Sequence, residues 1–166
     1  MTVSLRISES AYKVLQEDAA LQHTSLNTLA NQIFLSYSEF DRYMVKLHVI
    51  KLSSSTFRRI INAASDEAVS EAGRAAGGNA PKNFVLAKTG QLNVGTALDF
   101  LKSIATYSSL FEYGEASHEG KSTVTLAHDF GSKGSFFLSS YVESMFKNLE
   151  QQPKISHNVD AVIIEF

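Results

Sequence analysis

Strict alternation of apolar and polar residues near the start of the chain constrains its fold more than any other feature. Residues 2–8 place Val3, Leu5 and Ile7 on one side and Thr2, Ser4, Arg6 and Ser8 on the other. This twofold period predicts a β-strand with one buried face. A lone strand leaves backbone groups unpaired, and the residues that follow are helical in pattern. The simplest partner is therefore the same strand of a second chain, in a two-stranded antiparallel ribbon.

Two amphipathic helices are predicted directly after this strand. Ser8 is placed to cap a helix over about residues 9–21. The pattern breaks at Thr24, and Thr24 or Ser25 then caps a second helix that continues to about Tyr43. The second helix has a broad apolar face at the helical period, which consists of Leu26, Leu29, Ala30, Ile33, Phe34, Tyr37 and Phe40.

The order strand, helix, helix over about residues 2–43 resembles the ribbon-helix-helix family, the class of the methionine and Arc repressors. The segment Thr24-Ser25-Leu26-Asn27-Thr28-Leu29-Ala30-Asn31-Gln32-Ile33 carries the resemblance at the start of the second helix. The resemblance implies an intertwined homodimer whose ribbon enters the major groove of double-stranded DNA. A sequence-specific regulator of transcription is thus the expected function of a chain of this kind.

The resemblance also implies which residues contact DNA. The outward ribbon positions Thr2, Ser4 and Arg6 are expected to face bases, with Arg6 suited to pair with guanine O6 and N7. The start of the second helix is expected to hold a phosphate through exposed N–H groups and the helix dipole. The phosphate-contacting residues there are Thr24, Ser25 and Asn27.

Charge favours a second hypothesis beside the first. The chain has a net charge of -2 and a pI of about 6.2, whereas phosphate contacts normally need a basic surface. Residues 1–44 contain the cations Arg6, Lys13 and Arg42 against the anions Glu9, Glu17, Asp18, Glu39 and Asp41. The alternative is a dimeric protein-interaction protein, antitoxin-like or an adaptor, whose ribbon-helix-helix part only dimerises.

Composition excludes several other classes of protein. The chain has no cysteine, which excludes disulfides, thiolate metal sites and a cysteine nucleophile and suits a reducing cytoplasm. No apolar run approaches the roughly 20 residues that span a bilayer. No secretory signal is visible at the N-terminus. We therefore expect a cytoplasmic protein without a membrane-bound part.

The remaining residues, 45–166, predict a second domain of mixed structure. The pattern indicates a short strand within 48–52, a helix over about 53–72, a loop over 73–81, a short strand over 83–87 and a helix over about 94–105. Two hairpins follow, at 110–116 with 122–128 and at 154–157 with 161–166, separated by a helix that reaches about Leu149. The expected fold class is α+β: a ribbon-helix-helix domain over 1–44 and a domain over 45–166 whose two hairpins form one antiparallel sheet packed against helices.

The most function-like segment of this second domain lies between a strand and a helix. It contains His128, Ser132, Lys133 and Ser135, which could hold an anion or another ligand at the helix start. A plain turn with a serine cap explains the same residues. The segment has the residue types of a nucleophilic triad, but no nucleophile-elbow pattern surrounds Ser135, so no enzyme is expected.

Neither a metal nor a cofactor is expected. His118 and His128 fall at opposite ends of the predicted hairpin, too far apart to share a metal ion. We expect the second domain to add oligomer contacts or to sense a small-molecule or protein effector. Whether the dimers pair into tetramers is left open by the sequence.

Overall fold

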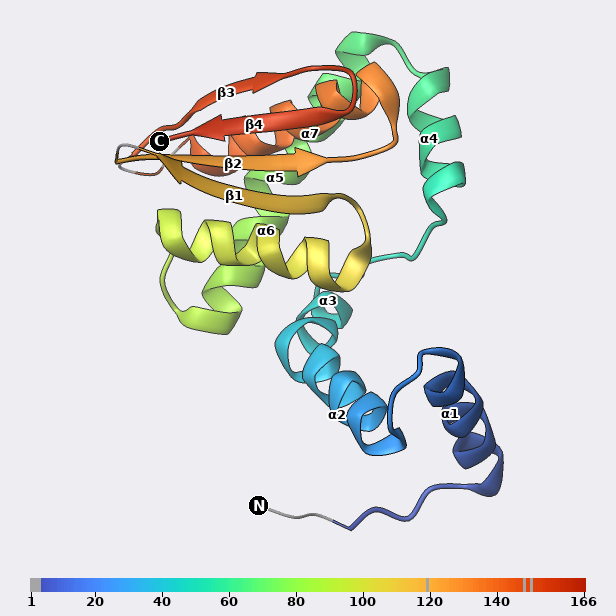
Figure 1. Ribbon diagram of the computed structural model, residues 1–166. Helices are drawn as coiled ribbons and strands as arrows, with labels where there is room; N and C mark the ends of the chain where they lie inside the picture. The colour runs from blue at the N-terminus through green and yellow to red at the C-terminus, as the bar shows by residue number, and fades with distance from the viewer. Residues whose placement is uncertain (1–3, 119, 148, 150) are drawn as a thin grey trace. The chain divides into compact units, whose positions relative to one another are not determined.

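The computed structural model describes residues 4–118, 120–147, 149 and 151–166. The chain divides into two compact units, Met1–Arg42 and Tyr43–Phe166, close to the expected domain boundary after residue 44. Figure 1 labels the helices and strands of both units.

The N-terminal unit is built around two helices that begin at serine caps. Helix α1 spans Glu9–Leu21 and helix α2 spans Leu26–Ser36. The Ala11 N–H donates to Ser8 Oγ at 3.2 Å, and the Thr28 N–H donates to Ser25 Oγ at 3.0 Å. Each cap satisfies a backbone donor that has no acceptor within the helix and stabilises the helix by about 1 kcal/mol. The predicted starts of both helices are confirmed.

Of the strand predicted over residues 2–8, the described part, residues 4–8, does not form a strand in the single chain. Thr2 and Val3 lie outside the described residues, and residues 4–8 form neither helix nor strand. Leu5 and Ile7 are 62% and 46% exposed, so the apolar face of this segment is not buried. A strand requires a neighbour for its backbone groups, and a ribbon of this segment would need a second chain to supply one.

The second helix does not end at Tyr43 as predicted. After α2 the chain continues through a π-helical turn, η1 (Tyr37–Asp41), into α3 (Arg42–Lys46). Ser36 Oγ donates to Asp41 Oδ2 at 2.7 Å across this turn, and Phe40 is buried. The strand expected within 48–52 is absent: these described residues are turn and coil.

The helix predicted over 53–72 is two helices. Helix α4 spans Ser54–Ala63 and helix α5 begins at Asp66. Ser65 causes the division, because its backbone is extended and its hydroxyl accepts the Ala68 N–H at 3.2 Å as the cap of the second helix.

Helix α5 (Asp66–Thr89) contains the segment predicted as a loop over 73–81 and the strand predicted over 83–87, so both predictions are wrong. Gly73 and Gly77 do not form a turn; they allow a second helix to pack closely against α5. A Cβ added to Gly73 would lie 2.3 Å from the Phe137 carbonyl oxygen, and one added to Gly77 would lie 2.0 Å from that of Tyr141. Helix α5 therefore runs against a second helix, α7 (Gly131–Phe146), at a separation that only glycine allows.

The C-terminal unit contains one antiparallel sheet made of two hairpins, as predicted. Its strands are β1 (Glu112–His118), β2 (Lys121–Ala127), β3 (Lys154–His157) and β4 (Ala161–Glu165), in the order β1-β2-β4-β3. The hairpins are joined where β2 pairs with β4, with Val124 opposite Ile164 and Leu126 opposite Val162. The α+β fold class is thus confirmed for this unit.

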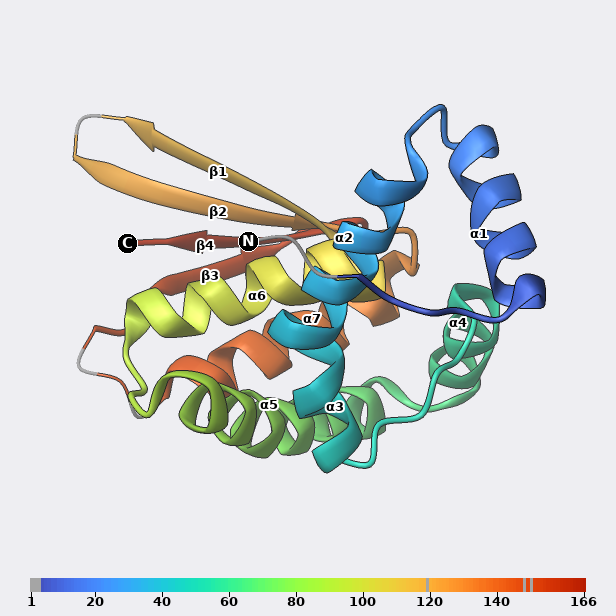
Figure 2. The same ribbon diagram turned by 90° about the horizontal axis from the view of Figure 1, so that it is seen from below.

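Helices α5, α6 (Val94–Ser108) and α7 lie on one face of this sheet, as Figure 2 shows. The alternating residues on that face are fully buried; they are Val124, Leu126, Val162 and Ile164. Leu101, Leu138 and Val142 meet them from the helices and are also fully buried. Helix α7 ends at Phe146, three residues before the predicted end at Leu149.

Candidate functional site

The start of α2 offers backbone N–H groups to an anion. The hydroxyl of Ser25 is already used, because it accepts the Thr28 N–H and lies 2.7 Å from Thr28 Oγ1. The N–H of Thr24 donates to the Ala19 carbonyl at 2.9 Å. The first N–H groups of the helix, at Leu26 and Asn27, have no acceptor within the helix. Of the three residues predicted to contact phosphate, Asn27 thus brings an exposed side chain as well as its N–H.

The residues predicted to read bases precede α1. Ser4 and Arg6 are exposed, and Thr2 lies outside the described residues. Arg6 is the cation of this segment, since the next one along the chain, Lys13, pairs with Glu9 at 2.8 Å on α1. The guanidinium of Arg6 is therefore placed where a ligand outside the chain could reach it.

Much of the apolar surface of the N-terminal unit is uncovered in the single chain. Only Ala19, Leu29 and Phe40 are buried among its described apolar residues. The predicted apolar face of the second helix contributes large exposed side chains: Ile33, Phe34 and Tyr37 are 44%, 52% and 62% exposed. Soluble monomers rarely expose large apolar patches of this kind.

In the C-terminal unit, the structure brings His128 and Ser135 together. Ser135, fully buried near the start of α7, has its Oγ 3.0 Å from His128 Nε2 and 3.1 Å from the Val159 carbonyl oxygen. The Phe130 N–H donates to His128 Nδ1 at 3.2 Å. These contacts connect the end of β2, the start of α7 and the turn between β3 and β4.

The direction of these hydrogen bonds decides what the pair can do. Because Nδ1 accepts from Phe130, the neutral imidazole carries its proton on Nε2 and donates it to Ser135 Oγ. The serine hydroxyl then donates to the Val159 carbonyl. A nucleophilic serine needs the opposite arrangement, in which the imidazole accepts the hydroxyl proton. The pair is therefore arranged as a structural link.

This link predicts a loss of stability in mild acid. Burial lowers the pKa of His128, against the opposing effect of the Asp160 and Asp129 carboxylates. Between that lowered pKa and the unfolded value of about 6.5, the unfolded chain binds more protons, so stability falls as the pH falls. Urea unfolding between about pH 7.5 and 5.5 should show this decline in the native chain and less of it in His128→Gln. The control His48→Gln, at an exposed position, should keep it; an equal slope in His128→Gln would contradict the role of His128.

The side chains of the two other residues predicted in this segment, Lys133 and Ser132, do not hydrogen-bond to the His128–Ser135 pair. Lys133 Nζ donates to the carbonyls of Asn62 and Ala64 at the end of α4, and it lies 3.7 Å from Asp66. The lysine thus neutralises the negative end of the α4 dipole. Ser132 is exposed. These contacts give His128, Lys133 and Ser135 structural partners within the chain.

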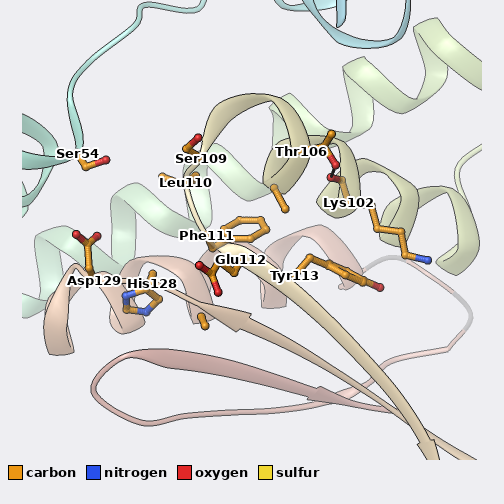
Figure 3. Close-up of a pocket in the computed structure, with 12 residues that line it drawn as sticks. Ser54, Lys102, Thr106, Ser109, Leu110, Phe111, Glu112, Tyr113, His128 and Asp129 are labelled. Atoms are coloured by element: carbon orange, nitrogen blue, oxygen red, sulfur yellow. Dashed lines mark hydrogen bonds between the residues drawn. The ribbon is translucent and has the colours of Figure 1, made fainter. Parts of the chain in front are cut away.

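A cavity of about 990 Å³ lies beside this segment, between α6, the start of β1 and the end of β2 (Figure 3). Its buried side is Phe111, and its rim carries Glu112, His128 and Asp129, with Lys102 at the other end. The volume is at the upper end of the range for small-molecule sites. The sequence pointed here only to the segment with His128 and Asp129, because the other residues come from separate elements without a shared motif.

Lys102 is held by neighbours at one end of this cavity. Its Nζ lies 2.9 Å from Glu115 Oε2 and 5.4 Å from the centre of the Tyr113 ring. The hydrogen bond and charge of Lys102 lower the pKa of Glu115, while burial and then Glu115 raise the pKa of Tyr113. Among the described residues, Glu112 and Asp129 form no hydrogen bond or ion pair through their carboxylates. The rim is thus better suited to a cationic group than to an anion.

The described residues contain no cluster of three or more His, Asp or Glu side chains that could hold a metal ion. No helix in the described part of the chain combines the length and hydropathy needed to cross a bilayer.

Comparison of the chain with protein-family models, curated proteins and solved structures finds no match. Its function is therefore inferred from the residues and contacts described above.

Proposed function

We propose that this protein is a sequence-specific DNA-binding regulator of transcription, of the ribbon-helix-helix class, that acts as a homodimer in the cytoplasm. The observation that carries the proposal is the N-terminal unit itself. An alternating segment leads into two serine-capped helices whose apolar side chains stay exposed in the single chain.

The exposed apolar surface supports the dimer. Leu5, Ile7, Ile33, Phe34 and Tyr37 would remain in water if the chain were a monomer. Burying a side chain of this size is worth about 1.5–3 kcal/mol. A second copy supplies both a matching apolar surface and the missing strand for residues 2–8, so one partner satisfies both needs.

The polar residues of the same unit support the DNA contacts. In a paired ribbon, Thr2, Ser4 and Arg6 share the face opposite the apolar one, and two copies present them twice. The free N–H groups at Leu26 and Asn27 can each hold a phosphate oxygen without a basic side chain. Backbone donors thus compensate in part for the acidic balance of the unit.

The reading role of Arg6 gives the first test of the proposal. On a duplex selected by the native chain, Arg6→Ala should weaken specific binding on the order of 10- to 100-fold, because each copy then lacks its paired hydrogen bonds to guanine. Arg6→Lys should keep binding to unrelated DNA but lose part of the specificity, because a flexible ammonium group lacks the rigid planar fork with which a guanidinium holds guanine O6 and N7. The measurement is a titration of labelled duplex at fixed salt.

Lys13→Ala is the matched control, since it also removes one cation but from an ion pair on α1. It should leave the ratio of specific to nonspecific affinity unchanged. Equal effects of Arg6→Ala and Lys13→Ala would contradict a base-reading role for Arg6.

The acidic balance of residues 1–44 favours a second candidate function, that of a dimeric adaptor or antitoxin-like protein. In that case the ribbon-helix-helix part only dimerises and the C-terminal unit binds another protein. This candidate predicts no retention on DNA even at low salt. The cavity beside His128 would serve an effector in either case.

A further inference from the structure

The sheet of the C-terminal unit has a second face that α5, α6 and α7 leave open (Figures 1 and 2). The register of the strands identifies the side chains on it, because directly paired residues point to the same side. Its centre consists of Gly114, Ala116, Thr123, Thr125, Ala127 and Ile163.

This face differs from an ordinary solvated sheet. The open side of an antiparallel sheet normally carries polar and charged side chains. Here the centre carries only small or β-branched residues, and the charged ones stand at its ends. Glu112, which also lies at the rim of the cavity, begins β1, and His118 ends that strand opposite Lys121. Glu165 pairs with Lys154 at 3.1 Å on the far strands. An uncharged centre of small side chains can lie against a second sheet at the usual separation of about 10 Å.

The placement of the end charges indicates which partner fits. Because β1 and β2 are antiparallel, Glu112 and Lys121 lie at opposite ends of the face. Consider a twofold axis that lies between two facing copies, parallel to both sheets and perpendicular to the strands. It reverses the direction of the strands in the second copy. It brings Glu112 of one copy opposite His118 and beside Lys121 of the other, twice, and places Thr125 opposite Thr123. The face is therefore complementary to itself in charge.

The size of the face sets how strong such a contact can be. Four strands of about five residues present roughly 300 Å², from a spacing of about 4.8 Å and a rise of about 3.3 Å. A free-standing interface buries about 800 Å² on each partner. The contact therefore needs copies that are already held close together, as they are in the dimer of the proposed function, on which this step rests.

We infer that the open face of the sheet, centred on Thr123 and Thr125, is a docking surface for the same face of a second copy of this chain. The C-terminal units then pair face to face, with Glu112 and Lys121 setting the register.

The absence of cysteine from the chain allows a direct test in the full-length protein. Thr125→Cys places a single thiol at the centre of the open face, and Thr106→Cys places one at an exposed position of α6. A short bis-maleimide should link most of the Thr125→Cys chains into covalent pairs and few of the Thr106→Cys chains. Labelling of the urea-unfolded variants with a mono-maleimide checks that both thiols react equally.

Light scattering on the same variants before cross-linking distinguishes a failure of the sheet contact from a failure of the proposed dimer. A dimeric mass with no more cross-linking at Thr125→Cys than at Thr106→Cys would overturn the sheet contact and leave the proposed dimer standing. A monomeric mass would overturn the proposed dimer and the sheet contact together.

Charge exchange tests the register independently. In the Thr125→Cys background, Glu112→Lys should reduce the rate of cross-linking by about fivefold, the effect of two exposed ion pairs replaced by repulsion. The double variant Glu112→Lys with Lys121→Glu should restore it. Failure of the second exchange to restore cross-linking would contradict the twofold arrangement.

Discussion

Replacing Gly77 by alanine is expected to destabilise the C-terminal unit by about 3 kcal/mol or more, the upper range for overpacking. The added methyl group would lie 2.0 Å from the Tyr141 carbonyl oxygen and 2.8 Å from its Cα. Both atoms belong to the backbone of α7, so no side chain can rotate away and the two helices must separate. Because that separation opens the core between helices and sheet, urea unfolding should shift to markedly lower concentration.

Gly78→Ala is the matched control in the same helix. The nearest atom to its added Cβ is Ser144 Oγ at 3.2 Å, the end of a side chain that can rotate. Alanine also favours the helix over glycine by about 0.5–1 kcal/mol, so this variant should be near neutral or slightly stabilising. Equal loss of stability in both variants would contradict the close approach of α5 to α7 at Gly77.

The second large effect is expected at Phe34, on the exposed apolar face of α2. In the proposed dimer this ring is buried in both copies, whereas in the single chain it is 52% exposed. Phe34→Asp removes the burial of two rings and adds two carboxylates to the interface. At about 1.5 kcal/mol or more for each ring, the dimer should weaken by at least 100-fold and DNA binding should fall with it.

Asn31→Asp provides the control for this variant. It introduces the same carboxylate one turn earlier, at an exposed polar position of the same helix. The mass of the Asn31→Asp variant in sedimentation at micromolar concentration should remain that of a dimer. A dimeric Phe34→Asp chain would show that this face is not the interface.

The sequence predicted elements where local chemistry decides the structure. Ser8 and Ser25 identified helix starts because a hydroxyl cap satisfies a backbone donor within three residues. The alternation around Val124 and Leu126 identified a strand with one buried face. Both signals come from neighbours along the chain.

The predictions failed where contacts between residues far apart in the sequence determine the local structure. Gly73 and Gly77 have the composition of a loop, and only the carbonyls of α7 give them their role within a helix. Leu5 and Ile7 alternate as in a strand but lack a neighbour in the single chain.

The candidate sites also combine features that the local sequence predicts with features that depend on distant contacts. His128 and Ser135 stood out in sequence because a strand there becomes a helix, but the direction of their hydrogen bonds depends on Phe130 and Val159. Lys102 and Glu112 both line the cavity, but they come from different elements. No spacing along the chain could have predicted that they line the same cavity.

The central claim is that two copies of this chain recognise one DNA sequence. Its most direct test is selection from random duplexes by the full-length protein, followed by titration of the enriched duplex at two salt concentrations. We predict a palindromic sequence bound with a shallow salt dependence, because few cations and several backbone N–H groups contact phosphate. No enriched sequence, with weak binding even at low salt, would contradict the claim.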